Sequence, residues 1–138
     1  MKVLVTGGAG FIGSHLVDAL VSAGHEAIII DHHRKEKMRF PNAQAKVYKI
    51  DFQSPELALI FQQEKPDAVC HLAAQISVTR SVADPVADAQ VNLLGAINIL
   101  ELARQSGCQK FIFASSGGAI YGDHPERPTP EKFDAEPL

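Results

Sequence analysis

The 138-residue chain has only two cysteines, no block of basic residues and no long apolar run near its first residue. Cys70 and Cys108 lie in apolar surroundings without the spacing of metal ligands, so they predict no metal site. The first apolar run ends at Gly7 and Gly8, well before the core of a secretory signal would be complete. These absences favour a reduced, cytoplasmic setting.

The charges are nearly balanced, with 13 basic and 16 acidic residues and a net charge of −3. Because no basic stretch stands out, the sequence offers no electrostatic surface for nucleic acid or for an anionic membrane. We expect neither as a partner. Hydrophobic residues make up 46% of the chain, which is enough for one core but, at this length, too little for two.

Short apolar runs alternate with helical patterns along the chain. The runs predict five strands, at residues 2–6, 26–30, 45–50, 67–72 and 110–115. Apolar residues at helical spacing predict helices at residues 12–23, 54–64 and 85–105. In the second helix, Ser54 is the expected N-cap and Pro55 the first helical residue.

Strands that are joined by helices run parallel, and their crossovers are right-handed. The sequence therefore predicts an α/β fold, a Rossmann-type doubly wound parallel sheet with strand order 3-2-1-4-5. We expect this domain to span residues 1–121. Residues 122–138 hold four prolines among mixed charges and predict a loop.

The stretch VTGGAGFIGSHL, at residues 5–16, places glycines where the first strand gives way to the first helix. Gly8, Gly10 and Gly13 satisfy G-x-G-x-x-G in the strand-to-helix context that this motif requires. One glycine permits the tight turn, Gly10 lets the backbone approach a pyrophosphate, and Gly13 allows close packing. The helix N-terminus then offers N–H groups and a positive dipole end to the phosphate. The alternative is a glycine-rich turn without a ligand.

Asp31 closes the second predicted strand. A carboxylate in this place can accept hydrogen bonds from both ribose hydroxyls of an adenosine, and it would repel a 2′-phosphate. The sequence therefore predicts that the cofactor is NAD rather than NADP.

The motifs together resemble a known family. TGGAGFIGSHL, IIIDHH, KIDF, HLAAQISV, VNLLGAINILELAR and FIFASSGGAIYG are similar to the N-terminal part of extended short-chain dehydrogenases/reductases. Within that superfamily the chain most resembles the NAD-dependent epimerase/dehydratase family. The form SSGGAIYG is similar to that of bacterial and archaeal UDP-glucose 4-epimerases.

The resemblance implies roles for single residues. Asp51 and Phe52 would contact the adenine, and Asn92 would brace the sheet near the site. Ser116 would be the catalytic hydroxyl that hydrogen-bonds the reacting sugar oxygen. The implied cofactor-binding set is Gly7, Gly10, Phe11, Ile12, Gly13, Asp31, Asp51, Phe52, Ala73, Ala74, Gln75 and Asn92, with Ala73, Ala74 and Gln75 along the diphosphate and ribose.

Several of these residues have a structural alternative. Asp51 could cap the turn after the third strand, and Asn92 could bond neighbouring backbone. His71 lies in an apolar strand, where we expect a hydrogen-bonded core histidine. Ser115 competes with Ser116 for the catalytic role.

The chemistry of this family needs a tyrosine and a lysine four residues apart, because the ammonium lowers the pKa of the phenol. Tyr48 and Tyr121 are the two tyrosines, and the residues four further on are Phe52 and Pro125. No Y-x-x-x-K motif is therefore present. We expect the chain to be the cofactor-binding part of a longer enzyme and to be inactive alone.

The expected function of that enzyme is nucleotide-sugar epimerisation, with a UDP-hexose as substrate and transient hydride transfer at sugar C4. A dehydratase, reductase or decarboxylase of the same family is the first alternative, and a non-catalytic NAD-binding module is the second. In the family, the helix that corresponds to residues 85–105 packs between subunits, so we expect a homodimer at full length and exposed apolar surface on this helix without its partner.

Overall fold

The structure, a computed structural model, describes residues 1–32, 42–116, 120–122, 128–130 and 132–135. Its centre is a five-stranded parallel sheet with the order β3-β2-β1-β4-β5. The strands are β1 (Lys2–Thr6), β2 (Glu26–Ile30), β3 (Lys46–Tyr48), β4 (Ala68–His71) and β5 (Lys110–Phe113). This confirms the predicted α/β fold class and strand order. The predicted loop over residues 122–138 lies partly outside the described residues.

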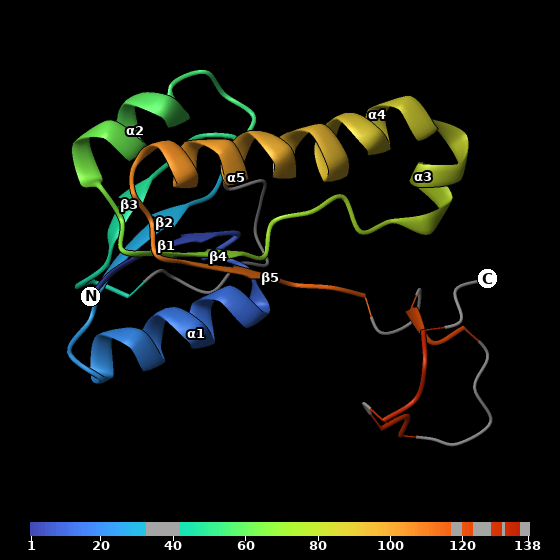
Figure 1. Cartoon of the computed structure of the whole chain (residues 1–138), viewed down its shortest axis with the longest axis horizontal. Helices are drawn as coiled ribbons and strands as arrows, with labels where there is room; N and C mark the ends of the chain where they lie inside the picture. Colours follow the sequence, from blue (N-terminus) through green and yellow to red (C-terminus); the bar gives the residue numbers. More distant parts are fainter. Residues whose placement is uncertain (33–41, 117–119, 123–127, 131, 136–138) are drawn as a thin grey trace.

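Helices cover the two faces of the sheet. Helix α1 (Phe11–Ser22) lies on one face, and α2 (Leu57–Glu64) and α5 (Gly95–Gln105) lie on the other (Figure 1). The strand residues alternate between the two cores, as strand geometry requires. Val3 and Val5 pack in the core that includes Val17 of α1, whereas Leu4 packs in the core with Phe61 and Ile99. Both faces are therefore buried.

The second helix begins later than the sequence predicts. It starts at Leu57 with Glu56 as N-cap, and no side chain caps it. The Ser54 hydroxyl accepts from the Glu56 N–H at 3.4 Å, which is the side-chain to backbone bond of a short serine turn and not of a helix cap. The Leu57 N–H donates to the Ser54 carbonyl at 3.0 Å and closes a further turn. The predicted N-cap at Ser54 and first helical residue at Pro55 are therefore wrong by two residues.

The long helix predicted over residues 85–105 is interrupted. It consists of α4 (Pro85–Ala89), the π-helical segment η1 (Gln90–Leu94) and α5. A short helix α3 (Val78–Ala83), which the sequence pattern did not predict, precedes it. Ser77 caps α3 by accepting from the Arg80 N–H at 3.3 Å, and Asp84 caps α4 by accepting from the Ala87 N–H at 3.0 Å. Single π turns inside helices are common at functional sites.

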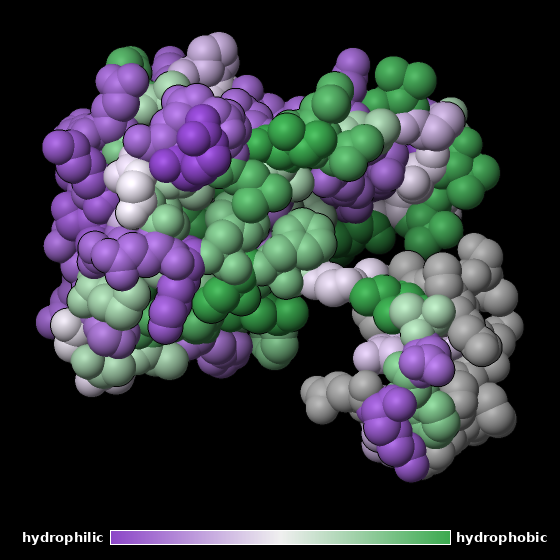
Figure 2. Space-filling model, in the orientation of Figure 1, coloured by the Kyte–Doolittle hydropathy of each residue, from purple (hydrophilic) through white to green (hydrophobic). Residues whose placement is uncertain are grey.

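Much of the apolar pattern on this helix faces outward. Five large apolar side chains are 47–67% exposed: Val86, Leu93, Leu94, Ile97 and Leu100. We call them the apolar helix face. Figure 2 shows apolar residues gathered over this helix and over β5 beside it. Ile99 and Ala103, at 0% and 3% exposed, hold α5 to the sheet instead.

The stretch Pro85–Gln105 also has the length and mean hydropathy, 1.2, of a helix that could cross a membrane. That criterion is weak evidence for a single helix, because the core helix of a folded domain meets it too. Here α5 contributes Ile99 and Ala103 to the main core of the domain.

A buried carboxylate joins α2 to the sheet away from these features. Glu64, 5% exposed, accepts hydrogen bonds from the Tyr48 hydroxyl and from Lys46 Nζ, and Lys2 Nζ lies 3.4 Å from its second oxygen. The bonds from Lys46 and Tyr48 lower the pKa of Glu64 to about 2. The carboxylate is therefore ionised and fully partnered, as a buried charge needs to be.

Candidate dinucleotide-binding site

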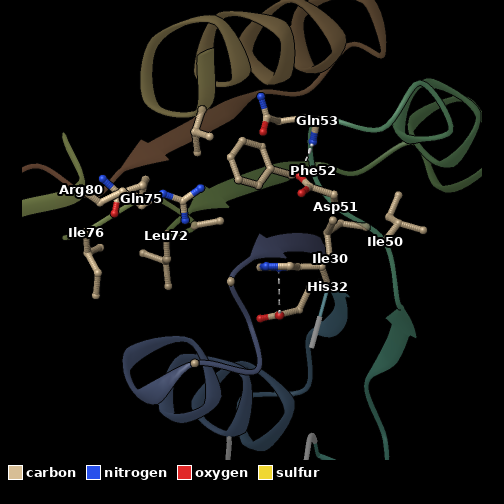
Figure 3. Close-up of a pocket in the computed structure, with 16 residues that line it drawn as sticks. Ile30, His32, Ile50, Asp51, Phe52, Gln53, Leu72, Gln75, Ile76 and Arg80 are labelled. Carbon is tan, nitrogen blue, oxygen red and sulfur yellow. Dashed lines mark hydrogen bonds and ion pairs between the residues drawn. The ribbon is translucent and has the colours of Figure 1, made fainter. Parts of the chain in front are cut away.

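A cleft of about 630 Å³ opens at the carboxyl ends of β1, β2 and β4. Figure 3 shows residues from the glycine-rich turn, from the segments after β2, β3 and β4, and from α3 around it. This is the edge at which parallel sheets of this type bind their ligands. Eight of the predicted site residues line the cleft: Gly7, Gly10, Asp31, Asp51, Phe52, Ala73, Ala74 and Gln75.

The glycine-rich turn follows β1 directly. Gly7 has φ +69°, in the left-handed region, so it is the glycine that supplies the tight turn, although it precedes the three glycines of the G-x-G-x-x-G motif. The Gly7 N–H donates to the Ile30 carbonyl at 2.9 Å, which ties the turn to β2. A Cβ at Gly8 would lie 2.9 Å from Ile29 Cγ2, so Gly8 serves packing.

Gly13 allows α1 to meet the turn. A Cβ on Gly13 would lie 2.2 Å from the Gly7 carbonyl oxygen and 2.7 Å from Gly8 Cα, both of them backbone atoms that cannot move aside. The close approach predicted for this residue is therefore present, although its partner is the turn itself. At Gly10 a Cβ would lie 3.2 Å from the Gly7 carbonyl oxygen, which is a tight contact, and would have no other atom within 4 Å, so this position is less crowded than Gly13.

Phe11 and Ile12 form the first turn of α1. Their side chains are 83% and 68% exposed and do not line the cleft. The backbone N–H groups of a first helical turn have no acceptor within the helix and carry its positive dipole end. Phe11 and Ile12 can therefore contribute their backbone N–H groups, and not their side chains, to the binding of an anion. Gly10, the N-cap of the helix, lines the cleft.

Asp31 lies at the end of β2 and is 6% exposed. Its Oδ2 accepts from the Ala9 N–H at 3.1 Å, so the carboxylate holds the glycine-rich turn as well as lining the cleft. The Asp31 N–H donates to the Tyr48 carbonyl at 3.2 Å. The backbone of Asp31 is thus anchored to β3 and its side chain to the glycine-rich turn.

Asp51 and Phe52 follow β3. Asp51 is exposed at the cleft, and its Oδ1 accepts from the Gln53 N–H at 2.9 Å, so it has the turn geometry that was the structural alternative as well as a place in the lining. The Phe52 ring is 8% exposed and packs edge-on against His71, with ring centroids 5.3 Å apart. A Cβ at Gly95 would lie 2.6 Å from the Phe52 ring, so α5 leaves room for it.

His71 is a core histidine, as predicted. It is 3% exposed, and its Nδ1 lies 2.6 Å from the Thr6 hydroxyl. That hydroxyl accepts from the N–H groups of Leu72 and Ala73, both at 3.2 Å, so its own proton goes to Nδ1. Burial lowers the pKa of His71 and keeps the ring neutral. The pair therefore fixes the start of the segment that lines the cleft after β4.

Asn92 does not line the cleft but holds a residue that does. Its Oδ1 accepts from the Gln75 N–H at 2.8 Å, and its Nδ2 donates to the Gln75 carbonyl at 2.9 Å and to Asp88 at 3.1 Å. The Gln75 side chain donates to the same Asp88 oxygen at 2.9 Å. Asn92, in the π-helical segment, thus braces the segment after β4 through its backbone.

Ser116 lies beyond β5, exposed and outside the cleft lining. Its carbonyl accepts from the Ile120 N–H at 3.0 Å. Ser115 is also exposed and outside the lining. The catalytic role of Ser116 therefore remains a prediction.

The cleft contains residues that the sequence did not single out as site residues. Those in the lining are Ile30, His32, Ile50, Gln53, Leu72, Ile76, Arg80 and Val91. Most of them adjoin a predicted residue and could have been found from that neighbourhood. Arg80 could not, because it comes from α3. Within the described residues, no group of three or more histidine, cysteine, aspartate or glutamate side chains gathers as metal ligands.

A strand, a glycine-rich turn, a helix N-terminus and the acidic residue Asp31 together are typical of one class of protein, the dinucleotide-binding α/β domains. The model of the NAD dependent epimerase/dehydratase family matches residues 3–138. The chain belongs to this family.

Three relatives illustrate the match. The UDP-glucose 4-epimerase of Mycolicibacterium smegmatis is 42% identical over 142 residues, which cover 99% of this chain and 45% of the relative. The Thermotoga maritima UDP-glucose 4-epimerase, solved with UDP-glucose, is 44% identical with a TM-score of 0.87 and covers 100% of this chain and 45% of its own. The Thermus thermophilus enzyme, solved with NAD, is 45% identical with a TM-score of 0.87 and covers 99% and 45%. The chain spans less than half the length of these relatives.

Alanine substitutions at Gly13 and Gly10 should have different effects, the first mainly on the stability of the fold and the second mainly on dinucleotide binding. Gly13→Ala should lower the free energy of unfolding by about 1–3 kcal/mol or prevent folding, because the added methyl meets fixed backbone. Gly10→Ala should cost less, about 1 kcal/mol, since the residue has an ordinary φ and its Cβ would meet only the Gly7 oxygen, at 3.2 Å, but it should weaken dinucleotide binding. Urea unfolding and calorimetric titration measure the two effects. Equal stability loss in both variants would contradict this assignment.

Proposed function

We propose that the chain binds NAD in this cleft and forms the cofactor-binding part of a nucleotide-sugar epimerase of the UDP-glucose 4-epimerase type. The observation that carries the proposal is the placement of Asp31 and Gly10 on one cleft, joined through the hydrogen bond from the Ala9 N–H to Asp31. A carboxylate suits the adenosine ribose, and the helix N-terminus beside Gly10 suits the pyrophosphate.

The residues present fit NAD. Gly10 lines the cleft without a side chain, so its backbone can approach a pyrophosphate. Asp51 and Phe52 lie where an adenine could rest beside the ribose-binding carboxylate, and Ala73 to Gln75 border the other side of the cleft. When bound, NAD supplies a reversible two-electron acceptor for the sugar. The family description and the NAD complex of the Thermus thermophilus relative support this choice.

The chain's own contribution to the reaction would be binding and orientation. Ser116, at the carboxyl end of β5, is the proposed hydroxyl that hydrogen-bonds the reacting sugar oxygen. A base that takes the proton from this oxygen is not available from a tyrosine-lysine pair among the 138 residues. We therefore propose that catalysis needs a further segment that carries Y-x-x-x-K.

Cofactor choice tests the role of Asp31. NAD should bind more tightly than NADP, because the carboxylate repels a 2′-phosphate. Asp31→Ala should weaken NAD binding about tenfold, as expected for lost hydrogen bonds to a charged group, and should reduce the preference over NADP. Calorimetric titration of both cofactors measures this.

Asp31→Asn is the matched control, because the amide oxygen can still accept from the Ala9 N–H while the charge is gone. It should retain the stability of the turn and still lose much of the discrimination against NADP. Equal affinities of the unaltered chain for the two cofactors would overturn the proposal.

Activity tests the missing base. The 138 residues alone should bind NAD and yet show no interconversion of UDP-galactose and UDP-glucose, because proton transfer by a positioned base contributes roughly 10²–10⁴-fold in rate. When a segment with Y-x-x-x-K follows, activity should appear, and Ser116→Ala should lower kcat more than NAD affinity. Turnover by the short chain, purified from a host without its own epimerase, would contradict this.

We further propose that the apolar helix face joins two copies of the protein. Its five side chains form one surface on one helix, with Ile112 and Phe113 of β5 also more than half exposed. Surfaces of this kind mark association sites. The chain should therefore self-associate in sedimentation velocity, increasingly so with concentration.

Ile97→Lys with Leu100→Lys should shift the population toward monomer. Leu59→Lys is the matched control, because Leu59 is 64% exposed on α2, outside the apolar helix face. A monomer at every concentration, or the same effect from the control, would argue against this interface.

A further inference from the structure

Arg80 brings a permanent positive charge to the cleft. Among the described residues that line it, Arg80 is the only lysine or arginine, and Asp31 and Asp51 are the carboxylates. Among these described residues, an anionic ligand therefore meets two carboxylates and one guanidinium. The negatively charged part of such a ligand is expected to lie near this guanidinium.

The backbone of Arg80 is held firmly. Its N–H donates to the Ser77 hydroxyl at 3.3 Å, and its carbonyl accepts from the Asp84 N–H at 2.9 Å. These bonds come from the caps of α3, and they place the Arg80 Cα at the border of the cleft. Figure 3 draws the side chain among the lining residues, with its nitrogen end turned into the cavity.

The guanidinium has no protein partner in the part of the chain that the structure describes. It makes no ion pair with Asp31 or Asp51, although both carboxylates line the same cleft. Arg104 shows the contrast, since its Nε and Nη2 donate to the two oxygens of Glu101 at 2.8 and 2.7 Å on the outer surface of α5. Arg80 thus keeps all its donors available inside a cleft built to accept an anion.

The geometry of a guanidinium matches one group of the dinucleotide. Its planar fork binds phosphate oxygens in pairs, and such charge-assisted hydrogen bonds are stronger than neutral ones. The first turn of α1 offers N–H donors from the β1 side of the cleft, and α3 brings Arg80 from the β4 side. Both sets of donors can bind the negatively charged pyrophosphate of the dinucleotide.

We propose that Arg80 is a pyrophosphate-binding residue, pairing with the phosphate oxygens of the dinucleotide opposite the N-terminus of α1. This rests on the proposed function, because it takes the ligand of the cleft to be NAD. It adds a side-chain cation to the backbone N–H groups that the first turn of α1 offers the pyrophosphate.

The test compares Arg80→Gln with Arg104→Gln, which removes the same charge from the far side of α5. NAD, ADP-ribose and adenosine are titrated against each protein by calorimetry at low and high salt. Arg80→Gln should weaken NAD and ADP-ribose by the same factor, about tenfold, and leave adenosine unchanged. The loss should shrink at high salt, because exposed charges are screened. Arg80→Lys should restore part of the affinity, and Arg104→Gln should bind as the unaltered chain does.

Three outcomes would overturn the proposal: unchanged affinity in Arg80→Gln, an equal loss in Arg104→Gln, or a loss for NAD without a loss for ADP-ribose. The last result would assign Arg80 to the nicotinamide half of the cofactor. Each leaves the proposed function standing as long as the unaltered chain binds NAD. Failure of the unaltered chain to bind either NAD or ADP-ribose would overturn the proposed function itself. Thermal unfolding should be the same in all variants, since Arg80 and Arg104 are both exposed.

Discussion

The site depends on one close approach, between the first turn of α1 and the glycine-rich turn after β1. Only a residue without Cβ can occupy position 13, because a methyl there would lie 2.2 Å from the Gly7 oxygen. This approach brings the N-terminus of α1 to the edge of the sheet. The proposed phosphate site would therefore be a consequence of packing, because the contact that seats the helix also brings its N-terminus to the cleft.

The polar residues of the site have structural duties as well. Asp31 accepts from Ala9 and so holds the turn, Thr6 and His71 fix the start of the segment after β4, and Asn92 holds the backbone of Gln75. Such supporting hydrogen bonds keep a ligand site in one geometry before the ligand arrives. A substitution in this site can therefore weaken ligand binding because it disturbs the local structure, even when the residue does not contact the ligand.

The outward apolar face of the long helix is the feature that a self-contained domain does not need. Its inner residues suffice to hold it to the sheet, yet its outer side chains are as apolar as a core. The relatives that match this chain are more than twice as long as the matched region. The interface proposed for this face and the base proposed to lie outside the 138 residues are consistent with a domain that works as part of a larger assembly.

The sequence by itself determined the sheet, its strand order and the main phosphate-binding elements, because strand and helix periodicity and the glycine spacing are local properties of the chain. The apolar pattern did not predict the start of α2 at Leu57, the π-helical segment or α3. Apolar spacing indicates where a helix can pack, whereas the ends of a helix follow from cap and turn hydrogen bonds such as those of Ser54, Ser77 and Asp84. Only the tertiary structure showed that Gly7 makes the turn and that Arg80 lines the cleft. The position of Arg80 depends on where α3 lies beside the cleft, and a pattern of apolar residues does not encode the direction of a charged side chain.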